Sequence, residues 1–307
     1  MSNNTLDGID VIYWINLDRS EDRKERMIDL FSDESFNNIP TQRFSAIDGK
    51  KDDIDEMITV KKKKITNSEY GCLLSHLEII NEFSKTDYKT ALILEDDVTL
   101  DFKQYWKKSI KEVMDGAPND WEIIMLCYHS DLLPTTEYTL NNKNYWSTAA
   151  YIIKKSAAEK ITKQTYISGT YNLDDTIKHA ADDYLYIKAK TYVYKYPFFI
   201  YGYSENTTIP TSNVKYHNWS RKRVEYMYEN EKNGKIIPIQ NIEGFGINTG
   251  VPFRGHMYSS SYKRGFFETY IFIILIILFL LFLLYILYFL HRFTFKPFKF
   301  LFRKTKS

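Results

Sequence analysis

A long uncharged stretch near the C-terminal end sets the first limit on how this chain folds. No charged residue occurs between Thr269 and Leu290, and Tyr270–Leu290 is entirely aliphatic or aromatic. At the helical rise of roughly 1.5 Å per residue, this stretch is about 30 Å long, which matches the hydrocarbon core of a bilayer. A buried helix of a soluble domain would usually keep a polar stripe. The pattern therefore predicts a transmembrane helix over residues 266–290, followed by a basic tail over residues 291–307.

The charge of the chain is distributed unevenly around this predicted span. The chain has 41 basic and 39 acidic side chains in total, but the tail after the span is basic and contains no acidic residue. Residues 1–265 are therefore mildly acidic, which argues against a nucleic-acid partner. The basic tail favours a cytosolic C-terminus. Met1–Asp10, in contrast, lacks the features of a secretory signal, and on this ground we expect residues 1–265 to lie in the cytosol.

The composition of the whole chain is that of an ordinary folded protein. Hydrophobic residues make up 44% of the sequence, with 12 glycines and 8 prolines, which is too apolar for a disordered chain. The two cysteines, Cys72 and Cys127, are too few for a disulfide framework or for a zinc site built from cysteines.

Short apolar runs alternate with amphipathic stretches through residues 1–203. Strands are predicted at Asp10–Leu17, Gln42–Ile47, Thr90–Leu94, Trp121–Leu126, Ser147–Ile153 and Val193–Tyr201. Helices are predicted at Asp18–Phe31, Leu73–Phe83, Tyr105–Met114, Ser156–Thr162 and Asp183–Lys190. The lysine-rich stretch Lys50–Lys64 and the segment 204–265 are expected to be loops, the latter an edge and linker toward the membrane. The alternation predicts an α/β domain with a mostly parallel central sheet.

Three consecutive carboxylates end one of the predicted buried strands. Glu95, Asp96 and Asp97 follow Thr90–Leu94 directly. In open α/β sheets, ligands bind beyond the carboxyl ends of the strands, and three clustered negative charges repel one another unless a cation joins them. Mg²⁺ and Mn²⁺ prefer such oxygen ligands. The run is therefore a candidate metal site, although acidic strand ends also occur without a metal.

Five motifs occur in an order and spacing that resemble a known family. They are Ile15-Asn16-Leu17-Asp18-Arg19 with Asp22-Arg23, Ala46-Ile47-Asp48-Gly49, Glu69-x-Gly71-Cys72-x-x-Ser75-His76, Ala91-Leu92-Ile93-Leu94-Glu95-Asp96-Asp97-Val98, and Ala181-Asp182-Asp183-Tyr184-Leu185. Together they resemble glycosyltransferase family 25, which includes lipopolysaccharide-biosynthesis glycosyltransferases and procollagen galactosyltransferases. The resemblance covers roughly two-thirds of the chain.

The resemblance implies a fold, a reaction and a cofactor. The fold would be a GT-A-like nucleotide-sugar-binding domain over residues 1–203. The reaction would be transfer of a hexose, galactose or glucose, from a UDP-sugar to a hydroxyl of a glycan or protein acceptor, with inversion at the anomeric carbon. Mn²⁺ or Mg²⁺ held by the carboxylate run would stabilise the charge of the leaving diphosphate.

The same motifs supply candidate residues for each role. Inversion needs a carboxylate that accepts the proton of the acceptor hydroxyl. Asp182 is the candidate and Asp183 the reserve, unless Asp182 only interacts with a helix N-terminus. The candidates for donor binding are Asn16, Arg19, Arg23, Asp48, Ser75 and His76. Arg23 could equally be a helix-surface charge, Asp48 a turn former and His76 a structural hydrogen-bonding group.

One alternative of a different class remains open at this point. A membrane-anchored GT-A-like binding module could keep the fold without the reaction, because fold alone does not establish activity. The intact carboxylate run argues against it. The acceptor is not specified. Four aromatic side chains could line an acceptor groove and stack on a sugar ring: Tyr128, Tyr145, Trp146 and Tyr171. The chain's 25 tyrosines are more simply a bias of composition.

Overall fold

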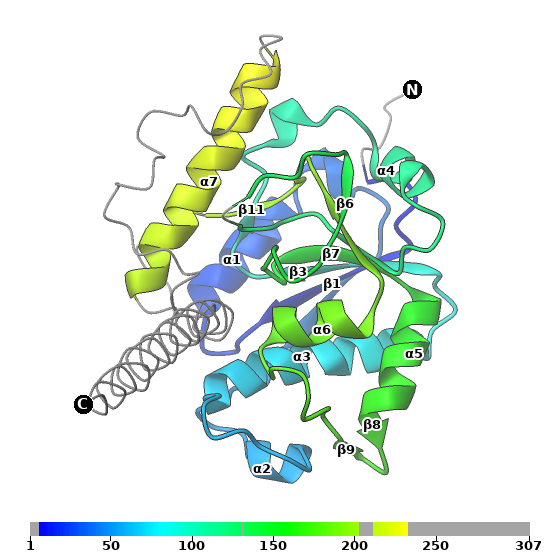
Figure 1. Ribbon diagram of the computed structural model, residues 1–307, viewed down its shortest axis with the longest axis vertical. Coiled ribbons are helices and arrows are strands. Elements are labelled where there is room, and N and C mark those ends of the chain that lie inside the picture. Colours follow the sequence, from blue (N-terminus) through cyan, green and yellow to red (C-terminus); the bar gives the residue numbers. More distant parts are fainter. Residues whose placement is uncertain (1–5, 131, 203–210, 233–307) are drawn as a thin grey trace, which may run out of the picture. The chain divides into compact units, whose positions relative to one another are not determined.

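The computed structural model describes residues 6–130, 132–202 and 211–232 (Figure 1). All of them belong to one compact unit of the chain, Met1–Thr249. The predicted transmembrane helix, residues 266–290, and the basic tail lie outside the described residues. None of the helices in the described ranges is both long and apolar enough to span a bilayer.

A seven-stranded sheet forms the centre of the described unit, in the order β2-β1-β3-β7-β5-β10-β6. Its strands are β1 (Val11–Asn16), β2 (Thr41–Ser45), β3 (Thr90–Glu95), β5 (Ile123–Met125), β6 (Tyr138–Leu140), β7 (Ala150–Lys154) and β10 (Thr191–Tyr194). β1 is parallel to β2 and β3, and β10 is parallel to β5, whereas β7 and the edge strand β6 are antiparallel to their neighbours. Five of these seven strands therefore run in one direction, which confirms the predicted α/β fold with a mostly parallel sheet.

Helices connect and cover these strands. They are α1 (Glu21–Leu30), α2 (Ile54–Met57), α3 (Asn67–Ser84), α4 (Ile110–Gly116), α5 (Lys155–Thr165), α6 (Ala181–Lys188) and α7 (Thr211–Lys232). Two small antiparallel pairs complete the unit, β4 (Val98–Thr99) with β11 (Ile200–Tyr201) and β8 (Tyr166–Ile167) with β9 (Thr170–Tyr171). α3 packs against both α5 and α6, and Figure 1 shows the three helices together on one face of the sheet.

Helix α3 shows why the local sequence folds as it does. Thr66 caps its N-terminus: the Thr66 hydroxyl accepts from the backbone N–H of Glu69, and the Glu69 carboxylate accepts from the backbone N–H of Thr66. The predicted apolar stripe is buried along the helix at Leu73, Leu74, Leu77, Ile80 and Phe83. The capped end and this stripe fix the face that α3 turns toward the sheet.

Several segments differ from the sequence-based prediction. The helix predicted at Tyr105–Met114 begins later, at the first residue of α4, and β6 was not predicted. The lysine-rich loop contains α2, because Ile54 and Ile58 are buried on either side of a single helical turn. The predicted strand Val193–Tyr201 is split into β10 and β11, with Pro197, which has no N–H to donate, between them. The segment expected to be loop-rich contains the 22-residue helix α7, whose apolar side chains are separated by charged ones.

Candidate functional site

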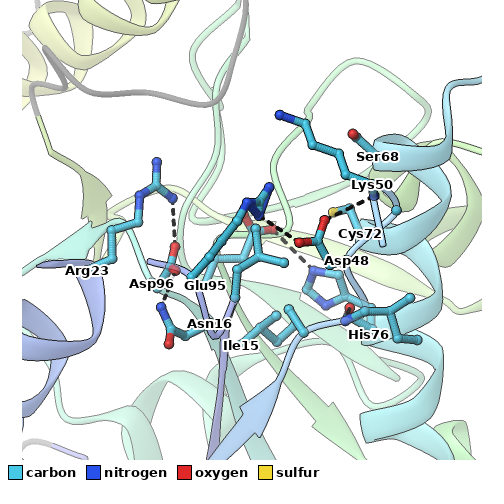
Figure 2. Close-up of a pocket in the computed structure, with 16 residues that line it drawn as sticks. Ile15, Asn16, Arg23, Asp48, Lys50, Ser68, Cys72, His76, Glu95 and Asp96 are labelled. Atoms are coloured by element: carbon cyan, nitrogen blue, oxygen red, sulfur yellow. Dashed lines mark hydrogen bonds and ion pairs between the residues drawn. The ribbon is translucent and has the colours of Figure 1, made fainter. Parts of the chain in front are cut away.

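The candidate site lies at the carboxyl ends of the parallel strands β1, β2 and β3. In the register of these strands, Asn16 pairs with Ser45 and Ile15 pairs with Glu95. Residues that are far apart in the sequence therefore meet at one edge of the sheet, as Figure 2 shows. Ligands of α/β sheets commonly bind at this edge.

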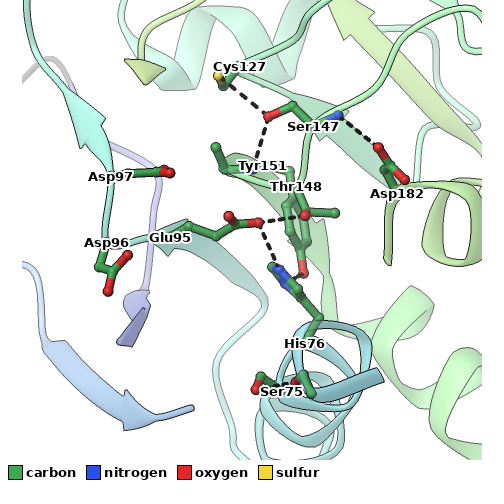
Figure 3. Close-up of polar contacts among 12 residues, drawn as sticks. Ser75, His76, Glu95, Asp96, Asp97, Cys127, Ser147, Thr148, Tyr151 and Asp182 are labelled. Carbon is green, nitrogen blue, oxygen red and sulfur yellow. Dashed lines mark hydrogen bonds and ion pairs between the residues drawn. The ribbon is translucent and has the colours of Figure 1, made fainter. Parts of the chain in front are cut away.

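Asp96 is the partner of two residues that the sequence marked for donor binding. Its Oδ1 atom accepts from Nη1 of Arg23 at 2.7 Å, and its Oδ2 atom accepts from Nδ2 of Asn16, also at 2.7 Å. The side-chain oxygen of Asn16 accepts in turn from Nε and Nη2 of Arg43, at 3.0 and 2.8 Å. In Figure 3, Asp96 points away from Glu95. The charge of Asp96 is compensated by its ion pair with Arg23.

The turn after β2 lies directly against the N-terminal part of α3, and two glycines permit this contact. A Cβ atom on Gly49 would lie 1.9 Å from the carbonyl oxygen of Asn67, and one on Gly71 would lie 2.5 Å from that of Ile47. The Ser75 hydroxyl accepts from the N–H of Ile47 at 2.9 Å and donates to the carbonyl of Gly71 at 2.7 Å. Ser75 is fully buried, and its two hydrogen bonds hold the turn in place.

Asp48 occupies this turn and faces the cavity. Its Oδ1 atom accepts from the N–H of Lys50 at 3.0 Å, as expected of a turn-forming aspartate. Its Oδ2 atom accepts from Nη1 of Arg19 at 3.1 Å. The Arg19 side chain is 31% exposed, so that its remaining N–H groups are accessible from the cavity.

His76 and Glu95 form the floor of the same cavity. Nε2 of His76 lies 3.2 Å from Oε1 of Glu95, and Nδ1 lies 3.0 Å from the hydroxyl oxygen of Tyr151. The Thr148 hydroxyl donates to the same Oε1 atom at 2.6 Å (Figure 3). Burial raises the pKa of Glu95, but the hydrogen bonds from His76 and Thr148 outweigh it and hold the pKa below its ordinary value. Glu95 is therefore kept as a carboxylate.

Asp97 is the least compensated member of the carboxylate run. Its Oδ1 atom is buried and has no hydrogen-bond partner within the described ranges. Its Oδ2 atom lies 3.9 Å from Nη1 of Arg23. Burial, and after it the charge of Glu95, raises the pKa of Asp97 to about 7. Figure 3 shows Asp97 and Glu95 pointing to the same side, so that these two carboxylates could hold a cation together.

The two candidate bases lie in the first turn of α6 and differ in their partners. Asp183 forms an ion pair with Nζ of Lys178 at 2.8 Å. Asp182 accepts from the N–H of Asp183 at 2.9 Å and from the N–H of Ser147 at 3.4 Å. Burial, and after it the charge of Asp183, raises the pKa of Asp182 above its ordinary value. Of the two, Asp182 is therefore the better proton acceptor.

The segment that precedes β7 connects this base to the carboxylate run. Ser147 contacts Asp182 through its N–H, and the next residue, Thr148, donates to Glu95. The backbone of Ser147 has φ 105°, a conformation that is strained for a residue with a side chain. The hydroxyl of Tyr186 donates to the carbonyl of Ser147 at 2.5 Å and holds it there. Strain of this kind is concentrated at functional sites.

The predicted site residues are distributed over three neighbouring cavities. The first is lined by all six donor-binding candidates together with two members of the carboxylate run: Asn16, Arg19, Arg23, Asp48, Ser75, His76, Glu95 and Asp96. The second is lined by Asp96 and Asp97 with residues of α1 and β4. The third contains Asp182 and Asp183 beside Tyr145 and Trp146. The structure thus unites the donor-binding candidates but not the whole predicted site in one cavity.

Four residues of the site were not identified from the sequence. Arg43 and Thr148 hydrogen-bond to predicted residues, Ser147 carries the strained backbone, and Cys72 lines the first cavity. The i, i+4 spacing of Cys72 and His76 was a signal that could have been used, because it puts both on one face of a helix. Thr148 begins the run Thr148-Ala149-Ala150-Tyr151-Ile152-Ile153, which also resembles the family. No comparable signal marks Arg43 and Ser147, since their partners are distant in sequence.

Comparison with known proteins identifies related chains. The family model described as Glycosyltransferase family 25 (LPS biosynthesis protein) matches residues 9–185. Procollagen galactosyltransferase 2 of Homo sapiens is 24% identical over 279 residues, covering 75% of this chain and 44% of that protein. Procollagen galactosyltransferase 1 of Danio rerio is 25% identical over 206 residues, covering 58% of this chain and 33% of that protein.

The chain spans less than half the length of these curated relatives. Among solved structures, a glycosyltransferase involved in the glycosylation of the major capsid of PBCV-1 is 12% identical and covers 60% of this chain and 92% of that one. The TM-score of this comparison is 0.30.

Proposed function

Because the chain belongs to glycosyltransferase family 25, we propose that it transfers a hexose, galactose or glucose, from a UDP-sugar to a hydroxyl group of a glycan or protein acceptor, with inversion. The observation that carries the proposal is the first cavity, where six residues from three separate motifs meet at the carboxyl ends of β1, β2 and β3. The family match over residues 9–185 covers these motifs and the beginning of α6.

The donor would bind in the first cavity through its diphosphate and its nucleoside. Arg19 and Arg23 line this cavity and carry the positive charge that a diphosphate requires. Arg23 already pairs with Asp96 at 2.7 Å, so that its orientation is fixed before the donor arrives. Asp48 offers a carboxylate to a ribose hydroxyl or a base N–H, since its turn holds it at the cavity wall.

A divalent cation, Mn²⁺ or Mg²⁺, would be held mainly by Asp97 and Glu95. The buried Oδ1 atom of Asp97, which has no partner in the described part of the chain, fits a cation ligand, and both carboxylates point to the same side. Bound there, the ion would stabilise the negative charge that develops on the leaving diphosphate. Asp96 would support the site through Arg23 and Asn16 rather than by direct coordination.

The proton of the acceptor hydroxyl would pass to Asp182. Inversion by single displacement needs a carboxylate on the side of the attacking hydroxyl. Among the described residues, Asp182 forms no ion pair, whereas Asp183 pairs with Lys178 at 2.8 Å. Tyr145 and Trp146 line the same small cavity as Asp182, and Tyr145 is buried there.

Donor screening with the 307-residue chain tests the proposal. UDP-galactose and UDP-glucose should raise the melting temperature in the presence of Mn²⁺ or Mg²⁺, because a ligand that binds only the folded state stabilises it. Hydrolysis of the effective donor to UDP and hexose should follow the same metal requirement. If the chain binds a UDP-sugar but neither hydrolyses nor transfers it, the alternative of a binding module without catalytic activity would hold instead. A chain that binds none would contradict the donor assignment.

The membrane anchor at Tyr270–Leu290 and the cytosolic position of residues 1–265 remain predictions. The uncharged run of about 30 Å supports the anchor. In sealed vesicles whose outer surface is the cytosolic side of the membrane, added protease should digest residues 1–265. Complete protection would show that the predicted orientation is wrong. Recovery of the chain in the soluble fraction would contradict the predicted membrane anchor.

A further inference from the structure

Three side chains of different chemistry converge at the floor of the first cavity. Cys72 and His76 lie one turn apart on α3, and Glu95 ends β3. The thiol sulfur, the imidazole nitrogen and a carboxylate oxygen all lie within 4.8 Å of one another. Cys72 is exposed, Glu95 is half-buried and His76 is buried, and all three line the cavity (Figure 2). No step of the proposed transfer reaction uses the thiol.

We propose that Cys72, His76 and Glu95 form a binding site for a thiophilic divalent cation such as Zn²⁺. Sulfur, nitrogen and oxygen are the donor atoms that zinc accepts, and three protein ligands with one open position describe its non-structural sites. Mg²⁺ and Mn²⁺ prefer oxygen donors and have little affinity for a thiolate. Binding would release the thiol proton of Cys72 to solvent and leave the sulfur as a thiolate ligand.

The geometry of the pair His76 and Glu95 already suits a tetrahedral ion. Bonds of about 2.0–2.2 Å to nitrogen and oxygen give a tetrahedral edge of about 3.3–3.6 Å, and Nε2 of His76 lies 3.2 Å from Oε1 of Glu95. The sulfur lies within 4.8 Å of both atoms.

The neighbours of the cluster supply the outer contacts that a metal site needs. A metal-binding imidazole donates its second N–H to a fixed partner, and the hydroxyl of Tyr151 lies 3.0 Å from Nδ1 of His76. A tyrosine hydroxyl can donate or accept, so that it suits both tautomers of His76: Nε2–H toward Glu95 without the ion, and Nδ1–H toward Tyr151 with it. Thr148 fixes the Glu95 carboxylate at 2.6 Å.

The consequence for catalysis rests on the proposed function. Glu95 is shared between this cluster and the hard-cation site with Asp97, and the cluster lies in the cavity assigned to the donor. Zn²⁺ bound to Cys72 would therefore compete with both the Mn²⁺ or Mg²⁺ ion and the UDP-sugar. Inhibition of transfer by Zn²⁺ should disappear in Cys72→Ser, but the binding itself can be tested without any donor.

Cobalt provides the direct test, because Co²⁺ replaces Zn²⁺ and is coloured. Titration of the wild-type chain with Co²⁺ should produce a thiolate-to-cobalt charge-transfer band and the intense visible bands of a four-coordinate ion, and Zn²⁺ should abolish both. Cys72→Ser should lose the charge-transfer band. The matched control is Cys127→Ala, which removes the buried second cysteine and should keep it. A band that survives Cys72→Ser, or that never forms, would overturn the proposal.

A second measurement uses the wild-type chain and is independent of any variant's folding. N-ethylmaleimide should label the exposed Cys72 and spare the buried Cys127, as mapped by mass spectrometry. The reaction is run at alkaline pH, because desolvation and the charge of Glu95 raise the pKa of the Cys72 thiol. Saturating Zn²⁺ should slow the labelling of Cys72 at least about tenfold, because the ligand-bound fraction is then unreactive, whereas Mg²⁺ should not. Equal rates with and without Zn²⁺ would contradict the site. If both measurements succeed and no UDP-sugar binds, the metal site stands and the proposed function fails.

Discussion

The carboxylates of this site fall into two groups that differ in how their charge is compensated. Asp48 and Asp96, which we call the paired carboxylates, accept from Arg19 and Arg23 at 3.1 and 2.7 Å. Asp97 and Asp182, the unpaired carboxylates, have no cation within hydrogen-bonding distance in the described part of the chain. The same side chain thus serves in two electrostatic environments a short distance apart.

In the proposed reaction, this difference in charge compensation separates the carboxylates that serve donor binding from those that serve the chemical step. The paired carboxylates orient arginines before the donor arrives, so that little reorganisation is needed on binding. The unpaired carboxylates remain ready for a positive charge that comes from outside, which in the proposed reaction is a metal ion for Asp97 and a proton for Asp182. Burial raises the pKa of both, to about 7 for Asp97, as expected of carboxylates without a compensating partner.

Removing the charge of an unpaired carboxylate should have the largest effect. Asp182→Asn keeps the shape of the side chain but cannot accept the acceptor proton, and kcat should fall by roughly 10²–10⁴, or about 3–5 kcal/mol. The affinity for the UDP-sugar should stay within about threefold, because Asp182 lies outside the donor cavity. Steady-state kinetics and a donor titration measure the two quantities.

Asp183→Asn is the matched control, one residue along the same helix. Asp183 is already neutralised by Lys178 at 2.8 Å, so that the loss in kcat should stay below about tenfold. Equal losses of kcat in the two variants would mean that the ion pair of Asp183 with Lys178 does not distinguish the proton acceptor. A loss of kcat confined to Asp183→Asn would identify Asp183 as the proton acceptor instead.

Breaking a pair should have the second-largest effect, on both stability and binding. Arg23→Gln leaves Asp96 buried without its cation, and we expect a loss of about 2–3 kcal/mol in the free energy of unfolding. The KM for the donor should rise by about tenfold or more, because a phosphate-binding group is lost as well. Chemical denaturation and donor kinetics measure these effects.

Arg26→Gln on the same helix is the control for this variant. The Arg26 side chain is 59% exposed and lies 3.7 Å from an equally exposed Asp22, so that its removal should cost less than about 0.5 kcal/mol. If the two arginine variants were equally stable, Asp96 would not depend on Arg23.

The paired carboxylates could be predicted from the sequence better than the contacts that support them. The apolar runs before Asn16 and Glu95 predicted β1 and β3, and the carboxyl ends of parallel strands meet in any α/β sheet. Gly49 and Gly71 were recognised only as parts of motifs. Glycine is required at these two positions because a turn approaches α3 closely, and this contact depends on packing between segments about 20 residues apart in the sequence.

The remainder of the site depends on properties that a single sequence does not display. The strained backbone of Ser147 is a consequence of tertiary contacts, among them the hydrogen bond from Tyr186. The direction in which each carboxylate of the run points is decided by its partners, Arg23 for Asp96 and Thr148 for Glu95. For this reason three adjacent acidic residues could be predicted as one metal site, whereas the structure gives them separate surroundings.

A smaller effect should follow from disturbing the turn that presents Asp48. A Cβ atom at Gly71 would lie 2.5 Å from the carbonyl oxygen of Ile47, so that Gly71→Ala must push the turn away from α3. We expect a loss of about 1–2 kcal/mol in stability and a rise in donor KM with kcat nearly preserved. A fall in kcat with unchanged KM would show instead that this turn serves the chemical step. Denaturation curves and steady-state kinetics on the same preparation separate the two outcomes.

The smallest effect we expect is a pH-dependent gain in stability when an unpaired carboxylate is removed. Burial, and after it the charge of Asp183, raises the pKa of Asp182 in the folded protein. A group with a raised folded-state pKa contributes stability fully below its unfolded pKa and loses that contribution as pH rises through the folded pKa. Asn is neutral at every pH, so that the melting temperature of Asp182→Asn should approach that of the wild type in acid and exceed it by about a few degrees at most at neutral pH. Scanning calorimetry of both proteins across this range measures the difference. A variant that loses stability relative to the wild type as pH rises would show that the Asp182 carboxylate is compensated in the folded protein, and the distinction between paired and unpaired carboxylates would then not extend to α6.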